Sequence, residues 1–211
     1  MNTNEIILVG GGGHCKSCID VIESEGKFII KGIIDLPHLL GSETLGYKVI
    51  GNDDDLPTFI ENGYSFLITM GHLGNANRRN HLFENILSLG GNLATVISST
   101  SKVSNHASIK KGSIIMHNAM VNAGTQIGPN CIINSGAIVE HDVVVEKHSH
   151  ISTGATVNGD VQIKEESFVG SGALIKNGLS IAKNTIIGMG AIVVKNIENS
   201  GTYIGNPARK I

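Results

Sequence analysis

Isoleucine or valine occupies every sixth position in the second half of the chain, without a break. The residues are Val103, Ile109, Ile115, Val121, Ile127, Ile133, Val139, Val145, Ile151, Val157, Ile163, Val169, Ile175, Ile181, Ile187 and Val193. A period of six fits neither an α-helix nor the two-residue alternation of a single strand. It is typical of hexapeptide repeats, each of which forms one short strand and one corner of a three-sided parallel β-helix. We therefore predict a β-helix, with three hexapeptides to each coil.

The other positions of the repeat support this interpretation. Four places after each aliphatic residue the chain mostly has a small side chain, as in Ala107, Ser113, Ala119, Thr125, Cys131 and Ala137. Such residues let neighbouring walls of the coil come close. Glycine, asparagine or aspartate recurs at the fourth position, where a tight corner requires a positive φ. Cys131 occupies the small, inward position, so it is not expected to act as a nucleophile.

Strands and helices alternate in the first half. We expect strands at Glu5–Val9, Lys27–Ile34, Ser65–Met70 and Leu93–Ile97, and helices at His14–Glu25, at Asp53–Asn62 and from an Asn75 cap to a Gly90–Gly91 stop. This order favours a small parallel, doubly wound (Rossmann-like) sheet. The predicted fold class is thus α/β plus β, with a Rossmann-like domain at 1–97 and a β-helix domain at 98–211.

Composition restricts the partners. The net charge is −2, and the sequence contains no run of like charges. Neither nucleic acid nor a membrane surface is therefore an expected partner. No stretch resembles a signal peptide or a membrane span. The chain has 3 cysteines, an odd number that provides no disulfide framework. We therefore expect a cytoplasmic protein.

A glycine turn is the first candidate site. Gly10, Gly11, Gly12 and Gly13 follow the first strand and precede His14. Ligands of open parallel sheets bind at this end, where a helix N-terminus and free backbone amides collect. The dinucleotide fingerprint is incomplete, because Cys15 occupies its third glycine position. A tight turn without a ligand stays the alternative.

Other residues could complete that site. Asp35 ends the second strand, where it could accept hydrogen bonds from a ribose or base, and Gly71 and His72 follow the third strand. Arg78 and Arg79 are candidate phosphate partners, or else part of a solvated helix face. The pair Cys15 and Cys18 has redox or half-zinc spacing, but no second pair exists and simple packing explains it better.

His141 is the candidate catalytic residue. It is the third residue of its repeat, so the same corner carries Ala123 in the coil before and Gly159 in the coil after. Both neighbours are small, which leaves the ring accessible, and Asp142 could hold the ring in one tautomer. A solvated corner histidine is the alternative. His38, His81 and His106 have no companion residues and are interpreted as surface or packing residues.

The whole chain resembles bacterial sugar acyltransferases that join a small Rossmann-like domain to a left-handed β-helix, a group that includes the bacillosamine-pathway N-acetyltransferase and sialic acid O-acetyltransferases. The resemblance rests on Gly10–His14, Asp35, Met70-Gly71, Asn134, Glu140-His141-Asp142, Ser149-His150, Gly154, Gly159 and Gly205-Asn206-Pro207-Ala208. Asp142 departs from the glutamate of the bacillosamine enzyme, and His72 stands where asparagine is common.

The resemblance implies a role for each matched residue. His141 would be the general base and Asp142 would orient it. The acceptor would be held by Gly11, Gly12, Gly13, His14, Asp35, Gly71, His72 and Asn134. Acetyl-CoA would be bound by His150, Gly159, Gly205, Pro207 and Ala208, with the Gly159 N–H facing the thioester carbonyl. A homotrimer is implied, with active sites between neighbouring coils and no metal.

The predicted activity is acetyl-CoA-dependent N-acetylation of a nucleotide-linked sugar of the UDP-4-amino-4,6-dideoxy type, in bacterial surface glycan synthesis. O-acetylation of a sialic acid or another sugar, and transfer to a GDP-linked amino sugar, would use the same residues. A trimeric scaffold or nucleotide-sugar sensor is the alternative from another class. A Rossmann-type oxidoreductase is disfavoured, because the fingerprint is incomplete and no substrate domain other than the coil exists.

Overall fold

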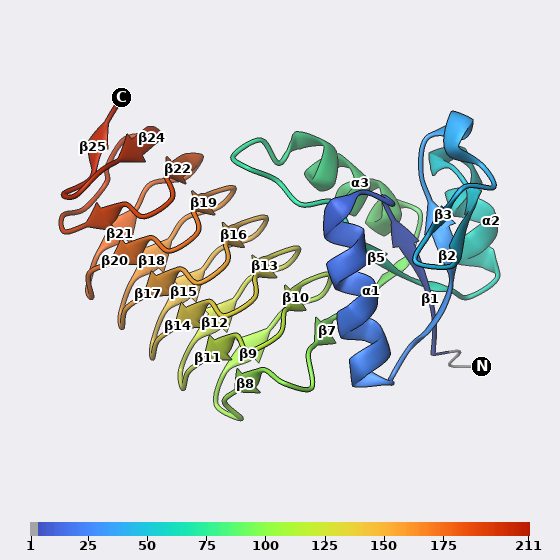
Figure 1. Cartoon of the computed structure of the whole chain (residues 1–211), viewed down its shortest axis with the longest axis horizontal. Coiled ribbons are helices and arrows are strands. Elements are labelled where there is room, and N and C mark those ends of the chain that lie inside the picture. Colours follow the sequence, from blue (N-terminus) through green and yellow to red (C-terminus); the bar gives the residue numbers. More distant parts are fainter. Residues whose placement is uncertain (1–3) are drawn as a thin grey trace.

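The computed structural model describes residues 4–211 and divides them between an α/β part and a β-helix, which lie side by side along the long axis (Figure 1). The α/β part is built on one six-stranded sheet in the order β3-β4-β2-β1-β5-β6. Its strands are β1 (Glu5–Val9), β2 (Ile29–Ile34), β3 (Glu43–Thr44), β4 (Tyr47–Gly51), β5 (Ser65–Ile68) and β6 (Asn92–Leu93). All neighbours pair in parallel except β3 and β4.

Helices cover both faces of this sheet, so its central strands are buried on both sides. The helices are α1 (Gly13–Glu25), η1 (Pro37–Leu39), η2 (Asp53–Asp55), α2 (Leu56–Glu61) and α3 (Asn77–Ser88). Apolar residues of α1 pack with Ile6 and Leu8 on one face of β1, whereas Leu82 and Ile86 of α3 pack with Ile7 on the other. The Rossmann-like part of the predicted fold class is confirmed.

Several predicted boundaries need correction, and one hairpin was missed. The third strand ends at Ile68 rather than Met70, and the third helix begins at Asn77 with Ala76, not Asn75, as its N-cap. The second strand begins at Ile29 rather than Lys27. The hairpin of β3 and β4 was missed, although Tyr47 and Val49 alternate with polar residues after a Leu45–Gly46 turn. The single strand expected at Leu93–Ile97 is wrong. Asn92–Leu93 pairs with β5, but β7 (Val96–Ile97) pairs with β10 (Ile114–Ile115) of the β-helix. The chain therefore changes from one sheet to the other between Leu93 and Val96.

The β-helix consists of three sheets whose strands are two residues long in most coils and pair in parallel, except for the last strand of the first sheet, which pairs antiparallel. The first sheet contains β7, β10 (Ile114–Ile115), β13 (Ile132–Ile133), β16 (His150–Ile151), β19 (Phe168–Val169), β22 (Thr185–Ile187), β24 (Gly201–Ile204) and β25 (Arg209–Lys210). The second contains β8 (Lys102–Val103), β11 (Met120–Val121), β14 (Ile138–Val139), β17 (Thr156–Val157), β20 (Leu174–Ile175) and β23 (Ile192–Val193). The third contains β9 (Ser108–Ile109), β12 (Gln126–Ile127), β15 (Val144–Val145), β18 (Gln162–Ile163) and β21 (Ser180–Ile181).

The six-residue pattern is the stacking pattern of this coil. The repeated aliphatic residues form one core inside it, and those from Ile115 to Ile187 are at most 1% exposed. Each pairs with its equivalent in the next coil, as Ile133 does with Ile151. The corners have positive φ at Gly112, Asn118, Gly124, Asn130, Gly136, Asp142, His148, Gly154, Asp160, Glu166, Gly172, Gly178, Asn184 and Gly190. The predicted hexapeptide-repeat β-helix is confirmed.

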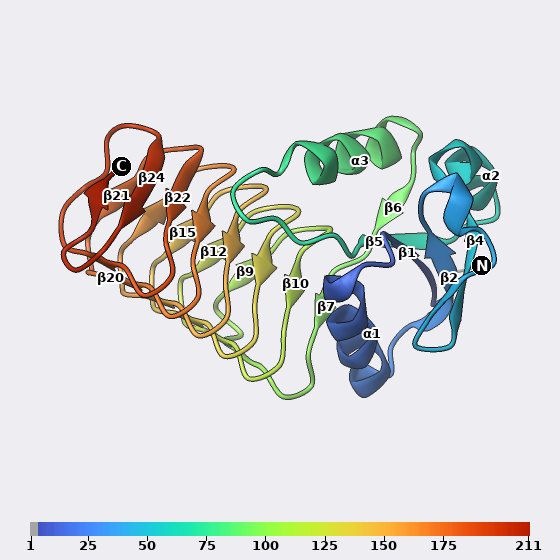
Figure 2. The same cartoon turned by 45° about the horizontal axis from the view of Figure 1, so that its top comes forward.

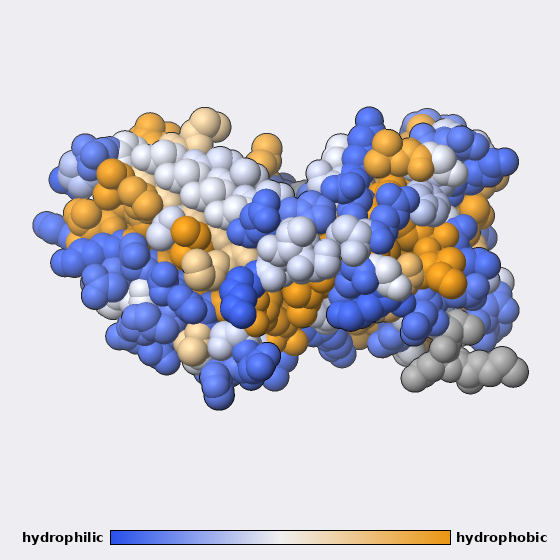
Figure 3. Space-filling view, turned by 60° about the horizontal axis from the view of Figure 1, so that its bottom comes forward, coloured by the Kyte–Doolittle hydropathy of each residue, from blue (hydrophilic) through white to orange (hydrophobic). Residues whose placement is uncertain are grey.

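The two parts are joined through the outer face of the first sheet. Ile114 and Ile132 point outward there and pack into the same cluster as α1. Farther along, the segment from β5 to α3 reaches over the coil, as Figure 2 shows, and Gly74 lies against Ile186. The surface is indented where the parts meet (Figure 3). The α/β part therefore occupies one of the three sides of the β-helix.

Candidate active site

His141 and Asp142 form a hydrogen-bonded pair at the corner between β14 and β15. The His141 Nδ1 and Asp142 Oδ2 atoms are 2.9 Å apart, and both side chains are largely exposed. The hydrogen bond to Asp142 raises the pKa of His141 above its ordinary value of 6.5, and the carboxylate charge adds to the effect. When Nδ1 donates to the carboxylate, Nε2 carries the free lone pair. The pair can therefore work as a general base and its orienting acid.

The two neighbouring corners are shaped to receive this pair. A Cβ added at Gly159 would lie 2.6 Å from both Cε1 and Nε2 of His141, so the ring rests on the bare backbone of the next coil. A Cβ at Gly124, in the coil before, would overlap Asp142 Oδ1. Asp142 itself has φ 59°, as the corner requires. Larger residues at these glycine positions would displace the pair.

The glycine turn opens α1 at the carboxyl end of β1. The α1 N-cap is Gly12, which provides no capping side chain, and the first turn has no acidic residue. A Cβ at Gly12 or Gly13 would meet nothing within 4 Å, so these two glycines leave the backbone open rather than close packed. A helix N-terminus of this kind attracts anions.

Asp35 supports the turn from β2. Its Oδ2 accepts the Gly11 N–H at 2.6 Å, and its Oδ1 accepts the Leu36 N–H at 2.8 Å. The residue stays half-exposed at the edge of the turn. Both carboxylate oxygens thus hold backbone amides, and either can accept one more hydrogen bond from a ligand.

Two cavities adjoin at this end of the sheet, and they share Gly10, Asp35 and Met70. The first, of about 370 Å³, is mainly apolar and is lined by Val9, Gly10, Ile34, Asp35, Leu36, Asp53, Met70, Arg78 and Leu82. The second, of about 300 Å³, is lined by Gly10, Gly12, Gly13, His14, Asp35, Thr69, Met70 and Gly71. An elongated ligand with an apolar ring and an anionic group fits such a pair.

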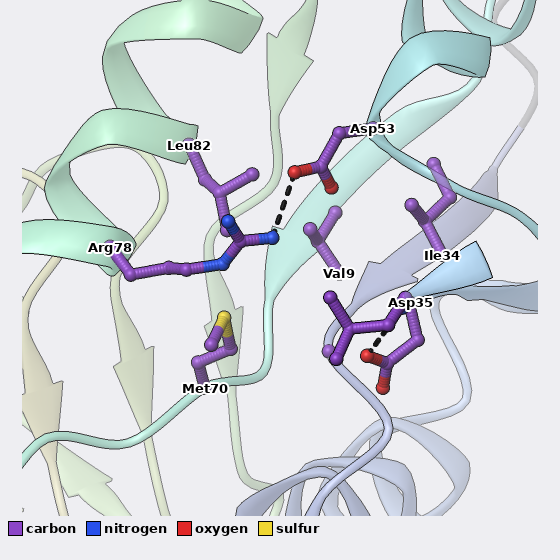
Figure 4. Close-up of a pocket in the computed structure, with 9 residues that line it drawn as sticks. Val9, Ile34, Asp35, Asp53, Met70, Arg78 and Leu82 are labelled. Carbon is purple, nitrogen blue, oxygen red and sulfur yellow. Dashed lines mark hydrogen bonds and ion pairs between the residues drawn. The ribbon is translucent and has the colours of Figure 1, made fainter. Parts of the chain in front are cut away.

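The two arginines of α3 lie in different environments. Arg78 reaches into the apolar cavity, where its Nη2 lies 2.9 Å from Asp53 Oδ2 (Figure 4). Arg79 is only 2% exposed and lines neither cavity, so it is neither on a solvated helix face nor able to touch a phosphate there. Asp53 is a cavity residue that the sequence interpretation missed, because it was assigned only a helix-starting role.

His150 and Asn134 lie on the first sheet, on the side of the α/β part. Asn134 Nδ2 donates to His150 Nε2 at 3.1 Å, so the other ring nitrogen carries the proton and donates to the His72 carbonyl at 2.9 Å. Burial lowers the pKa of His150 to about 4. His150 is 4% exposed, and both of its ring nitrogens form hydrogen bonds within the chain. Its contact with acetyl-CoA stays a prediction.

The rings of His14 and His72 lie close to the ring of His150. The His72 and His150 ring centroids are 5.4 Å apart, and those of His14 and His150 are 6.4 Å apart. Burial lowers the pKa of both His14 and His72 to about 3. Their Nε2 atoms are buried without a hydrogen-bond partner in the described chain. These three histidines are therefore neutral at physiological pH.

The C-terminal residues lie on the last coil. The Ile192 N–H donates to the Gly205 carbonyl at 3.0 Å and the Ala208 N–H to the Ile192 carbonyl at 2.8 Å, so the segment that contains Pro207 folds against β23. β23 belongs to the second sheet, which also carries the strand that precedes His141. Gly205, Pro207 and Ala208 are thus on the side of His141, several coils away.

Comparison with known proteins agrees with both halves of this arrangement. The PglD N-terminal domain family matches residues 5–86, and the bacterial transferase hexapeptide family (six repeats) matches residues 106–141 and 124–159. The acetyltransferase domain of PglB from Neisseria gonorrhoeae FA1090 is 30% identical, with a TM-score of 0.92 over 99% of this chain and 100% of that chain. It has also been solved in complex with acetyl coenzyme A.

The chain therefore belongs to the family of sugar acyltransferases that combine a PglD N-terminal domain with bacterial transferase hexapeptide repeats. PerB from Caulobacter crescentus, solved with CoA and GDP-perosamine, is 30% identical, with a TM-score of 0.90 over 98% of this chain and 97% of that one. WeeI from Acinetobacter baumannii AYE is 25% identical, with a TM-score of 0.78 over 98% and 99% of the two chains. The predicted enzyme class, acyltransferase, is confirmed, and the scaffold alternative loses its support.

Features outside the family's acyl-transfer chemistry have a structural explanation. Cys15 and Cys18 are buried in the α1 packing, and burial raises the pKa of the Cys15 thiol to about 11 and that of Cys18 further. Neither forms a disulfide, and residues 4–211 contain no cluster of three or more potential metal ligands. Within the same range, none of the helices combines the length and the hydrophobicity needed to cross a membrane.

Proposed function

We propose that the enzyme transfers the acetyl group of acetyl-CoA to the amino group of a nucleotide-linked 4-amino sugar, of the UDP-4-amino-4,6-dideoxy type. The observation that carries this proposal is the His141–Asp142 pair resting on Gly159, in a chain that matches sugar acetyltransferases along its whole length. The complex of the PglB domain with acetyl coenzyme A supports the donor. The PerB complex with GDP-perosamine supports an amino-sugar nucleotide as the acceptor and makes GDP the alternative carrier.

In the proposed step the acceptor amine attacks the thioester carbonyl directly. His141 Nε2 takes the proton that the amine loses, the new C–N bond forms, and the C–S bond breaks. The departing CoA thiolate then takes the proton from the histidine, so no acyl-enzyme is formed. Asp142 holds the ring tautomer and stabilises the transient imidazolium. Base catalysis of this kind contributes roughly 10²–10⁴-fold, and holding both substrates in place contributes further.

The Gly159 N–H is the proposed donor to the thioester oxygen. It has no hydrogen-bond partner among the described residues, whereas the Gly159 carbonyl accepts the Gly178 N–H at 2.9 Å. The free N–H belongs to the residue on which the His141 ring rests. A backbone donor aimed at a developing oxyanion contributes about 10²–10³-fold.

The two cavities of the α/β part are the proposed nucleotide site. The apolar cavity suits a base, and the polar cavity offers the α1 N-terminus and the open glycine backbone to a diphosphate. Asp35 lines both cavities, where a ribose would bridge them. Asn134 would face the sugar, with its amide oriented by His150.

We further propose that a second copy of the chain completes the site, in a homotrimer. The α/β part packs on the first sheet, but His141 lies at the corner between the second and third sheets, on the far side of the coil. A nucleotide sugar held by one chain therefore needs the His141 of another.

The second sheet is the proposed contact. Its outward positions include Met120, Ile138, Leu174 and Ile192, none of which belongs to the clusters that hold the described chain together. Outward positions of the third sheet are mostly polar, such as Ser108, Gln126, Gln162 and Ser180. Apolar faces of this kind are typical of subunit contacts.

The test is thermal unfolding with UDP, GDP, CMP or NAD, each with and without acetyl-CoA, followed by mass spectrometry of acetyl transfer to the matching 4-amino sugar. A ligand at a hundred times its Kd stabilises by about 2.7 kcal/mol. Stabilisation by acetyl-CoA and by one nucleotide is expected, with a product heavier by one acetyl group. Absence of any response to acetyl-CoA would overturn the proposal, and a response to NAD alone would favour a dinucleotide enzyme.

A further inference from the structure

Arg79 is a buried cation without a counter-ion. It is 2% exposed, and the described residues include no carboxylate that forms an ion pair with it. Its Nη1 donates to the carbonyls of Ile68 and Met70, the latter at 2.8 Å, and its Nε lies 3.5 Å from the Asn130 carbonyl. Nη2 has no hydrogen-bond partner within residues 4–211. Burying a charge in this way is costly unless an opposite charge comes close.

The titratable groups around Arg79 do not supply that charge. Burial raises the pKa of the Cys131 thiol to about 12 and that of Cys18 further, so both thiols are neutral. The nearby rings of His14, His72 and His150 have lowered pKa values and are neutral as well. Burial lowers the pKa of Arg79 only to about 10, so the guanidinium is charged at neutral pH. The positive charge of Arg79 thus has no ion-pair partner inside the described part of the protein. The Asp35 carboxylate, which lines the polar cavity, already accepts hydrogen bonds from two backbone amides.

This charge lies beside the polar cavity. The two carbonyls that bind Nη1 belong to Ile68 and Met70, on either side of Thr69, and both Thr69 and Met70 line the cavity. The α1 N-terminus lines the same cavity with its own positive dipole end. A charge in a low-dielectric interior acts over several ångströms and is weakly screened by salt. Both features therefore favour an anion in that cavity.

We propose that the counter-ion of Arg79 is the diphosphate of the bound nucleotide sugar, which Arg79 attracts without touching. The inference rests on the proposed function, because it takes the polar cavity as the diphosphate site. Arg79 also holds the carbonyl end of β5 against the corner at Asn130, so it is a positioning residue for the cavity wall. The effect of its charge on the ligand and the effect of its hydrogen bonds on the cavity wall can be tested separately.

The experiment measures affinity as a function of ligand charge. Calorimetric titration of the full chain compares the diphosphate that binds, UDP or GDP, with its monophosphate and its nucleoside. The proteins are the unmodified chain, Arg79→Gln, Arg79→Lys and the control Lys48→Met, which removes an exposed charge on β4 away from both cavities. Arg79→Gln should weaken diphosphate binding by about tenfold or more but nucleoside binding by less than about threefold. Arg79→Lys and Lys48→Met should keep the preference for the diphosphate.

Equal weakening of all three ligands by Arg79→Gln would overturn the inference, because a purely structural role predicts that result. If Arg79→Gln does not fold, the calorimetric titration of Arg79→Lys tests the inference instead. This variant keeps the charge but loses the fork of donors, so loss of the diphosphate preference would also overturn the inference. If the unmodified chain binds neither UDP nor GDP, the proposed nucleotide site fails, and this inference fails with it.

Discussion

Replacing Asp142 with asparagine separates the two roles that this residue combines. Asp142 is hydrogen-bonded to His141 at 2.9 Å, and it forms a corner with φ 59°. Asparagine tolerates positive φ better than other non-glycine residues, and it has the shape of aspartate. It therefore fits above Gly124, where Asp142 Oδ1 leaves no room for a larger group. The substitution removes the charge and the fixed acceptor while it keeps the corner.

The expected loss comes mainly from the orientation of the ring. Asp142 can only accept from His141 Nδ1, so it selects the tautomer with Nε2 free for the substrate proton. The asparagine amide of the variant could instead donate to Nδ1, which would put the proton on Nε2 and block it. We expect kcat to fall about 10- to 100-fold at high pH, which is part of the general-base contribution. The corner should persist, with an unchanged thermal unfolding midpoint.

The pH dependence provides a second, independent result. The base must be neutral, so kcat/KM rises with pH through the pKa of His141, which Asp142 raises above 6.5. In Asp142→Asn this limb should move to lower pH, since the raising hydrogen bond and charge are lost. The unmodified enzyme is the more protonated of the two in mildly acidic buffer. The ratio of its kcat/KM to that of the variant should therefore decrease as the pH falls.

The control is Asp160→Asn, because Asp160 occupies the same corner one coil later, with φ 58°. Its backbone N–H donates to the His141 carbonyl at 3.0 Å, a bond that asparagine keeps, and its side chain has no hydrogen bond to the His141 ring. Acetyl transfer is followed by thiol release across a pH series, at saturating and limiting acceptor. Asp160→Asn should leave kcat within about twofold of the original. If Asp142→Asn changes neither kcat nor the acidic limb, or if both variants change them equally, Asp142 does not orient the base.

Three further substitutions test the site and the fold. His141→Ala should lower kcat by at least about a hundredfold with an unchanged unfolding midpoint; a fall of less than about tenfold in the same thiol-release assay would remove His141 from the base role. Gly159→Ala puts a Cβ 2.6 Å from the His141 ring, so kcat should fall by about tenfold or more, and an unaffected kcat would contradict the ring position. Ile151→Ala removes a side chain that is 0% exposed inside the coil and should cost about 2–5 kcal/mol in urea unfolding, whereas a cost below about 1 kcal/mol would argue against the stacked core.

The β-helix was predictable from the local pattern, whereas the acyltransferase activity was predicted from the resemblance of the whole chain to a known family. A six-residue period can be satisfied only if equivalent residues stack, so Val103 to Val193 determined the coil and its inward positions without further information. The same frame placed Gly159 directly after His141 in its column and identified Asp142 as its neighbour. Because a coil repeats in register, sequence spacing becomes spatial neighbourhood there.

The α/β part was less predictable where contacts are distant in sequence. The strand expected at Leu93–Ile97 reads as one apolar run, but its two ends pair with different sheets. The two arginines of α3 are adjacent in sequence, yet Arg78 lines a cavity and Arg79 is buried. A helix rotates neighbouring residues onto different faces, and which face is buried depends on what packs against it.

The sequence alone thus determined the repeat, the class of fold, and the histidine and aspartate of the proposed base, because each depends on spacing within a regular coil. Only the tertiary structure decided that His150 is buried under His72 and that His141 lies on the far side of the coil from the α/β part. It also decided that Arg79 has no counter-ion within the described chain. These facts depend on how the α/β part packs against the β-helix, and no periodic pattern in the sequence indicates that packing.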